Sequence, residues 1–156
     1  MLRLATLAGL AIGANAIAVP LAKRAALESC LKEAEVPIDA PGTKDYEMDS
    51  APFNVRLPYS PAAIAVPQTE KHIQDAIACG VKNGVKVTPK CGGHSYSNFG
   101  FGGEDGHLML ELDRMNEVTI DKDGIATVPG GSRLGHVAYT LFNEAGRAFS
   151  HGTCPG

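Results

Sequence analysis

One glycine-rich stretch contains residue types that could do chemistry: KCGGHSYSNFGFGG, residues 90–103, has a single histidine, His94. Glycines at this density cost backbone entropy on folding, so the chain there must turn sharply or approach another group closely. Gly92 and Gly93 directly follow an expected strand, and their N–H groups can bind an anion such as a pyrophosphate. The stretch is neither GxGxxG nor a P-loop, so a tight structural loop is the alternative.

The cysteine thiols are the second reactive group. Whether they can form disulfides depends on the compartment, which the amino-terminal residues indicate. In residues 1–18, Arg3 precedes an apolar run, and Ala16-Ile17-Ala18 has the small-x-small pattern of a cleavage site. The run is shorter than the roughly 20 residues of a membrane span, which argues against an anchor. We therefore expect residues 1–18 to be a signal peptide and the protein to be secreted and extracellular, with no membrane association after cleavage.

An oxidising compartment permits disulfides, but sequence alone does not choose among the possible pairings. The four cysteines are Cys30, Cys79, Cys91 and Cys154. No CxxC pair occurs, so the sequence predicts no metal site. The net charge of -3 is scattered, which argues against a nucleic-acid partner.

The elements that must position the glycine loop follow from hydrophobic spacing. AAIAVP at residues 62–67 predicts a buried strand, Thr69 a helix N-cap for residues 70–84, and VKVTP at residues 85–89 a second strand. Strand, helix and strand in this order form a βαβ-type unit with parallel strands. HLMLEL, after the loop, predicts a further strand.

The flanking segments complete an α+β pattern. Residues 21–36 have helical spacing, and residues 37–52 are rich in Pro, Asp and Gly, which predicts an extended connector. EVTID and IATVP form a hairpin around Gly124, and residues 132–147 form an amphipathic helix capped by Ser132 and ended by Gly146. The carboxylates are expected to be surface or turn groups: Glu104, Asp105, Glu111 and Asp113.

Three segments together resemble a known family. They read GGHSYSNFGFGGEDGHLMLELDRM, GIATVPGGSRLGHV and GRAFSHGTCPG. This resembles the PCMH-type (vanillyl-alcohol-oxidase-like) FAD-binding domain of secreted berberine-bridge-enzyme-like oxidases, in the branch of fungal glucooligosaccharide and chitooligosaccharide oxidases. We therefore expect residues 1–18 to be a signal peptide, 19–52 a leader helix and connector, and 53–156 part of the FAD-binding domain that the resemblance implies. The resemblance also implies that the chain is the N-terminal portion of a longer protein.

The resemblance implies bicovalent FAD, because in that family a histidine bonds the flavin 8α carbon and a cysteine bonds C6. His94 and Cys154 match these two residues, and the chemistry suits a neutral imidazole and a thiolate. Tyr96 matches an aromatic residue that lies beside the substrate. Weaker cofactor-contact matches are Gly92, Gly93, Ser95, Gly130, Gly131, Ser132, Gly152 and Thr153. Cys30 and Cys79 match a disulfide pair, and Cys91 departs from the pattern, because this branch has a small non-thiol residue there.

The implied function is an FAD-linked oxidase acting on CH–OH groups of an oligosaccharide or other small alcohol. Hydride passes to flavin, and O₂ reoxidises it to give H₂O₂, so the cofactor carries the redox chemistry. No general base is assigned in this chain, because the family supplies it from a later segment. Two alternatives stay open: a short secreted domain that binds FAD without turnover, and a cofactor-free domain in which Cys91 pairs with Cys154.

Overall fold

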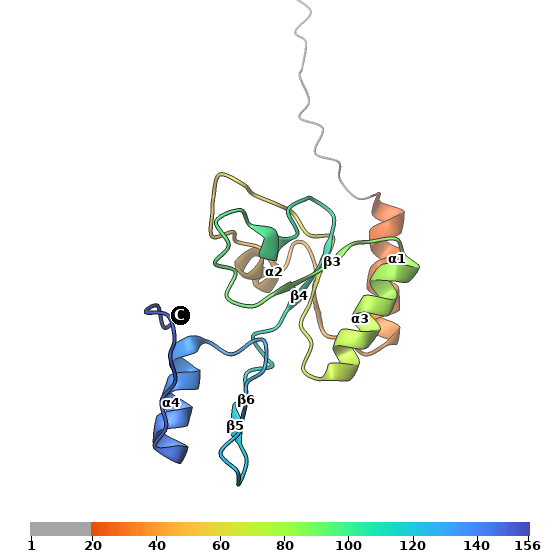
Figure 1. The fold of residues 1–156 in the computed structure, drawn as a ribbon. Coiled ribbons are helices and arrows are strands. Elements are labelled where there is room, and N and C mark those ends of the chain that lie inside the picture. Colours follow the sequence, from red (N-terminus) through yellow and green to blue (C-terminus); the bar gives the residue numbers. More distant parts are fainter. Residues whose placement is uncertain (1–19) are drawn as a thin grey trace, which may run out of the picture.

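The computed structural model describes residues 20–156, so the expected signal peptide at residues 1–18 lies outside the described residues. A four-stranded sheet forms the centre of the fold, in the order β1-β2-β4-β3 (Figure 1). Its strands are β1 (Ile38–Asp39), β2 (Ala63–Ala65), β3 (Val87–Lys90) and β4 (Leu108–Glu111). β2 and β3 both pair parallel with β4, which confirms the βαβ prediction, and β1 pairs antiparallel with β2.

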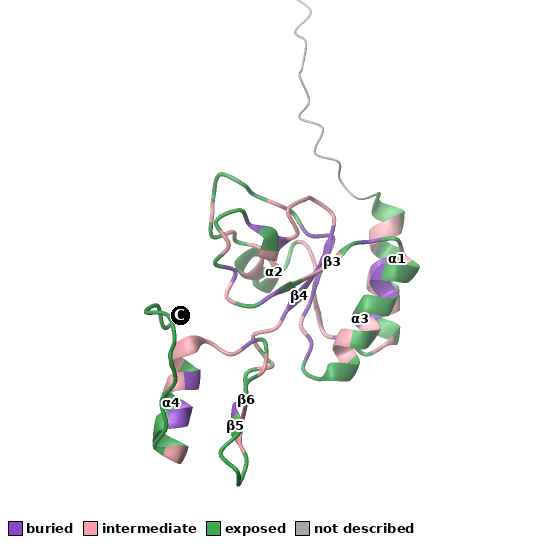
Figure 2. Ribbon diagram, in the orientation of Figure 1, coloured by how far each residue is buried: buried purple, intermediate pink, exposed green. Residues whose placement is uncertain are grey.

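Helices cover both faces of this sheet, and strand alternation explains how. Ala63, Ala65, Leu108 and Leu110 face α1 (Leu21–Glu33) and α3 (Glu70–Lys82), with which they form the main core. Between them along the strands, Ile64 and Met109 face the other side and pack with Phe101. That side also carries α2 (Lys44–Asp49) and the 3₁₀ helix η1 (Phe99–Phe101). The central strands are accordingly buried on both faces (Figure 2).

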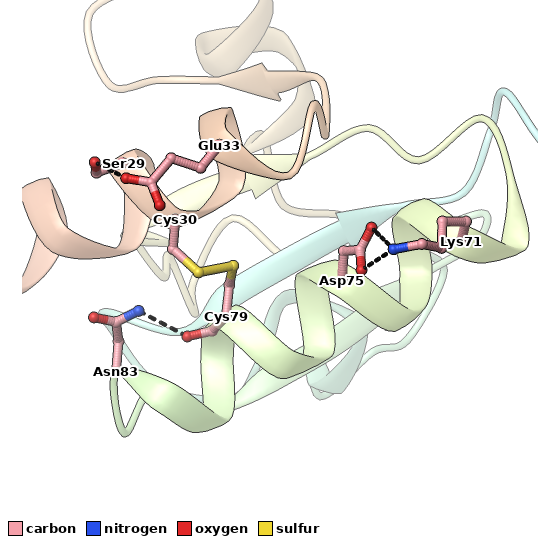
Figure 3. Close-up of a disulfide and its surroundings, with 7 residues drawn as sticks. All are labelled: Ser29, Cys30, Glu33, Lys71, Asp75, Cys79 and Asn83. Carbon is pink, nitrogen blue, oxygen red and sulfur yellow. Dashed lines mark hydrogen bonds and ion pairs between the residues drawn. A yellow bond between two sulfur atoms is a disulfide. The ribbon is translucent and has the colours of Figure 1, made fainter.

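A disulfide joins the two helices of the first face. Cys30 of α1 bonds Cys79 of α3, with their Cα atoms 5.7 Å apart (Figure 3). This is the pair that the family resemblance implied. The bridge closes a loop with a sequence separation of 49 residues, which constrains the unfolded chain.

The remaining elements form a smaller unit beside the sheet. β5 (Thr119–Ile120) and β6 (Ala126–Thr127) form the expected antiparallel hairpin, and α4 (Leu134–Ala145) packs against it. Its buried core consists of Val118, Val137 and Leu141. We call residues 21–112 the sheet unit and residues 118–156 the hairpin unit; Figure 1 shows them side by side, joined by a short segment.

Two local expectations were wrong. The segment at residues 37–52 is not simply extended, because it contains β1 and α2; the Thr43 hydroxyl caps α2 by accepting a hydrogen bond from the Tyr46 N–H at 3.2 Å. Ser132 does not cap α4. Its hydroxyl instead donates to the Asn116 carbonyl at 3.3 Å, and Arg133 occupies the N-cap position. Among residues 20–156, no helix is long and apolar enough to cross a membrane.

Candidate cofactor site

The glycine loop begins where β3 ends, as expected. We call residues 91–98 the anchor loop. Gly93 is buried and has a φ of +70°, a conformation that suits glycine. At Gly92, a Cβ atom would lie 2.7 Å from His94 Nδ1 and 3.1 Å from Arg133 Nη1. A side chain at this position would require the His94 imidazole or the Arg133 guanidinium to shift, so glycine leaves both groups close to the backbone here.

A buried ion pair lies under the start of the anchor loop. Lys90, the last residue of β3, pairs with Glu111, the last residue of β4. The Lys90 ammonium also donates to the Asp49 carbonyl at 3.0 Å and lies 5.4 Å from the ring centroid of Phe101. Burial raises the pKa of Glu111, and the Lys90 ammonium opposes that rise. Glu111 is thus a core residue, and the expectation of a surface carboxylate was wrong for it.

His94 and Tyr96 are both exposed on the outer side of the anchor loop. The ring of Phe53 contacts both: it meets His94 edge-on and stacks on Tyr96. The Ser95 hydroxyl accepts a hydrogen bond from the Phe99 N–H at 3.3 Å, so Ser95 shapes the turn. The loop therefore presents an imidazole and a phenol next to each other at the surface.

Arg133 is the site residue that the sequence analysis missed. Its Nη1 atom is buried and has no hydrogen-bond partner among residues 20–156. A buried guanidinium nitrogen without a partner is costly, which points to an acceptor absent from the protein itself. Arg133 follows GGS in the second family-like segment. A positive charge directly after a glycine turn was the sequence signal that could have marked it as a candidate anion-binding residue.

The C-terminal tail returns along α4 to the beginning of that helix (Figure 1). There the Gly135 N–H donates to the Pro155 carbonyl at 2.8 Å, which fixes the residue after Cys154 at the first turn of α4. The Nη1 atom of Arg133, at the same helix end, lies close to Gly92 of the anchor loop. The beginning of α4 therefore lies against the segments that carry His94 and Cys154, and the helix macrodipole makes this end favourable for anions.

The weaker cofactor-contact candidates of the hairpin unit lie either at the junction of the two units or in the exposed tail. A Cβ atom on Gly131 would lie 1.7 Å from the Leu112 carbonyl oxygen, so packing at the unit junction requires this glycine. Gly130 is exposed and lies beside the Leu112 side chain. Gly152 and Thr153 are exposed in the tail. Cys91 and Cys154 are both free and exposed, so they do not pair with each other in this structure.

A cavity of about 420 Å³ lies elsewhere, between β1, α2 and the residues after β4. Its carboxylates include Asp39, Asp45, Asp49 and Asp113. Burial and the negative charges of Asp49 and Asp45 raise the pKa of Asp39. Neither His94 nor Cys154 lines this cavity, so it is separate from the anchor loop.

Comparisons with known proteins identify the family of the chain. A family model described as "FAD binding domain" matches residues 61–154. The chain is 58% identical over 143 residues to a xylooligosaccharide oxidase of Thermothelomyces thermophilus, covering 91% of this chain and 29% of that protein. It is 59% identical over 144 residues to a carbohydrate oxidase of Microdochium nivale, with 91% and 29% covered.

Solved structures show the same relationship. One is a glucooligosaccharide oxidase from Acremonium strictum, described as having 6-S-cysteinyl, 8α-N1-histidyl FAD; it superposes with a TM-score of 0.81 at 48% identity, over 83% of this chain and 27% of that one. The chain thus spans between a quarter and a third of the length of these relatives. By the matched domain and these identities, the chain belongs to the FAD-binding-domain family, among the berberine-bridge-enzyme-like FAD-linked oxidases.

Proposed function

We propose that this chain holds FAD through His94 and Cys154 and serves in a secreted FAD-linked carbohydrate oxidase. The observation that carries the proposal is the Arg133 Nη1 atom, which is buried near Gly92 at the N-terminal end of α4 and has no hydrogen-bond partner among residues 20–156. A guanidinium beside a glycine turn and the N-terminal end of a helix is a usual protein environment for a phosphate or pyrophosphate group. The donors present therefore fit the anionic part of a dinucleotide.

The proposed covalent contacts use residues that the fold leaves accessible. His94 and Cys154 are exposed, and both lie on segments in contact with the beginning of α4. A flavin bound through one histidine and one cysteine is described for the Acremonium strictum glucooligosaccharide oxidase. By this proposal His94 takes the 8α position and Cys154 the C6 position, while Gly92, Gly93, Ser95, Gly130, Gly131, Ser132, Gly152 and Thr153 contribute backbone around the cofactor.

The chemistry that FAD supplies when bound is removal of a hydride from a CH–OH carbon and transfer of two electrons to O₂, giving H₂O₂. The residues of this chain bind and orient the cofactor and, through Tyr96, offer an aromatic face to a sugar ring. We assign no general base to this chain. The proposed substrate is an oligosaccharide or another small alcohol, since relatives are xylooligosaccharide and carbohydrate oxidases. The Cys30–Cys79 disulfide supports an oxidising, extracellular location.

Covalently retained flavin tests the proposal directly. The purified chain is incubated with FAD, precipitated with acid, and the visible absorbance of the pellet is measured. Either proposed bond alone would keep flavin in the pellet, so His94→Ala is tested in a Cys154→Ser background. We expect a coloured pellet from the wild type and from Cys154→Ser, and a loss of most of this colour in the His94→Ala, Cys154→Ser double variant. The matched control, His136→Ala, removes an exposed histidine of α4 and should retain the colour.

A parallel pair of variants tests the second attachment. Cys154→Ser should remove the 6-S contribution to the flavin spectrum, whereas Cys91→Ser should keep it. Production of H₂O₂ with cello- or chito-oligosaccharide supports the oxidase, and colour without peroxide supports FAD binding alone. A colourless wild type, or equal retention in Cys154→Ser and in the double variant, contradicts the assignment of His94.

A further inference from the structure

Residues 53–57, which we call the strap, lie over the anchor loop and are bound to it by two asparagines. The Asn54 N–H donates to Asn98 Oδ1 at 3.1 Å, and Asn54 Nδ2 donates to the Tyr96 carbonyl at 2.8 Å. In return, Asn98 Nδ2 donates to the carbonyls of Asn54 and Leu57, both at 2.8 Å. Asn98 is fully buried with a φ of +52°, so this reciprocal lock is a fixed part of the fold.

The strap places one aromatic ring against two rings of the anchor loop. The Phe53 centroid lies 5.7 Å from that of His94 with the ring planes at 78°, an edge-to-face arrangement. The same ring lies 5.6 Å from Tyr96 with the planes at 22°, a stacked arrangement. Both arrangements are favoured for aromatic pairs.

Core packing does not explain Phe53, because its side chain is 54% exposed. His94 makes no hydrogen bond through its imidazole to any of the residues described by the structure, 20–156. The Phe53 ring is therefore the side chain that packs against the imidazole, which also lies close to the Gly92 backbone. Tyr96 is 80% exposed, and Phe53 covers one face of its ring only.

We propose that Phe53 is a positioning residue, which holds the His94 imidazole in one orientation and supports Tyr96 from behind. This rests on the proposed function, in which His94 bonds the flavin and the free face of Tyr96 meets a sugar ring. Phe53 itself touches neither. Its effect comes from narrowing the orientations of the attacking imidazole, and small misplacements of a reacting group can slow a reaction by up to about 100-fold.

The first test needs no flavin. In the purified chain, nuclear Overhauser contacts are measured from the Phe53 ring to the His94 and Tyr96 rings. We expect both contacts, and we expect Phe53→Leu to shift the His94 ring protons because the aromatic ring current is lost. Phe53→Tyr should keep the wild-type shifts. Val55→Ala, in the same strap and 79% exposed, is the matched control and should leave them unchanged.

The second test measures the time course of covalent flavin incorporation in a Cys154→Ser background, so that only the proposed His94 bond is followed. Phe53→Leu should slow the incorporation by about tenfold or more, whereas Phe53→Tyr and Val55→Ala should each keep the wild-type rate. A wild type that takes up no covalent flavin contradicts the proposed function, while the ring contacts still decide the placement of Phe53. Wild-type incorporation at an equal rate in Phe53→Leu overturns the role of Phe53 alone. If Phe53→Leu does not fold, absence of the wild-type ring contacts overturns it.

Discussion

The sheet unit and the hairpin unit differ in how many independent contacts hold them together. The sheet unit has helices on both faces of its sheet, a disulfide and a buried ion pair. The hairpin unit has a three-residue buried core, and several of its large apolar side chains are exposed. These are Ile125, Val128, Tyr139, Phe142 and Phe149.

This difference matters because the candidate site joins both units. His94 belongs to the sheet unit, whereas Arg133 and Cys154 belong to the hairpin unit. A ligand bound by residues of both would stabilise the less stable unit through linkage, since it binds only when both are folded. We infer that the sheet unit is the rigid partner and that FAD, when bound, would hold the hairpin unit against it. The predictions below test this asymmetry.

The largest effect is expected from breaking the buried ion pair of the sheet unit. Lys90→Met leaves Glu111 without its partner in the core and should lower the free energy of unfolding by about 3–5 kcal/mol. Lys86→Met breaks the exposed pair with Glu104, and the loss should be at most about 1 kcal/mol. Urea denaturation measures both. Equal losses would contradict the view that burial of this pair matters.

Truncating one leucine in each core compares the units directly. Leu31 is fully buried in the main core, and Leu31→Ala should lower the free energy of unfolding by about 2–5 kcal/mol. Leu141 lies in the three-residue core of the hairpin unit and is 9% exposed. Leu141→Ala should therefore lower the free energy of unfolding by about 2 kcal/mol or less.

Amide hydrogen exchange shows where each loss occurs. Leu141→Ala should speed exchange in α4 and leave α3 protected, because the hairpin unit can open by itself. Exchange that rises equally in both helices would show instead that the two units unfold together.

The smallest effect is a pH dependence confined to the sheet unit. Burial lowers the pKa of His107 from its usual 6.5. Its Nδ1–H donates to the Glu104 carbonyl at 2.8 Å, and its buried Nε2 has no partner among residues 20–156. A lowered pKa gives stability that is present above about 6.5 and lost as the pH falls through the folded-state value.

Acidification from about pH 7.5 to pH 5 should therefore destabilise the wild type more than His107→Gln. Denaturation midpoints at each pH measure this difference. Glu111 and Asp39 have raised pKa values, so their contributions have the opposite sign, and the comparison of variants removes them. An identical pH profile in both proteins would contradict the role of His107.

The sequence predicted the elements whose signals are local. Thr69 caps α3 by accepting from the His72 N–H, Gly124 lies in the hairpin turn, and Gly146 ends α4, all as expected. The glycine pair after β3 was likewise expected, and comparison with relatives confirmed the family. These features depend on residues a few positions apart, which spacing and propensity describe well.

The missed features depend on contacts between distant residues. Lys90 and Glu111 are register partners of parallel strands, and periodicity does not give register. β1 has two residues and exists only because it pairs with β2. Phe53 is 41 positions from His94 in the sequence, and Arg133 and Gly92 belong to different units. No local sequence pattern therefore predicts that either pair lies close together.

The Cys30–Cys79 bridge has a practical consequence for anyone producing this protein. It joins two helices on the face of the sheet opposite η1, and expression in a bacterial cytosol would yield chains that lack this disulfide. Such material could give a colourless preparation for reasons unrelated to the cofactor. Expression through a periplasmic or yeast secretory route is the appropriate starting point.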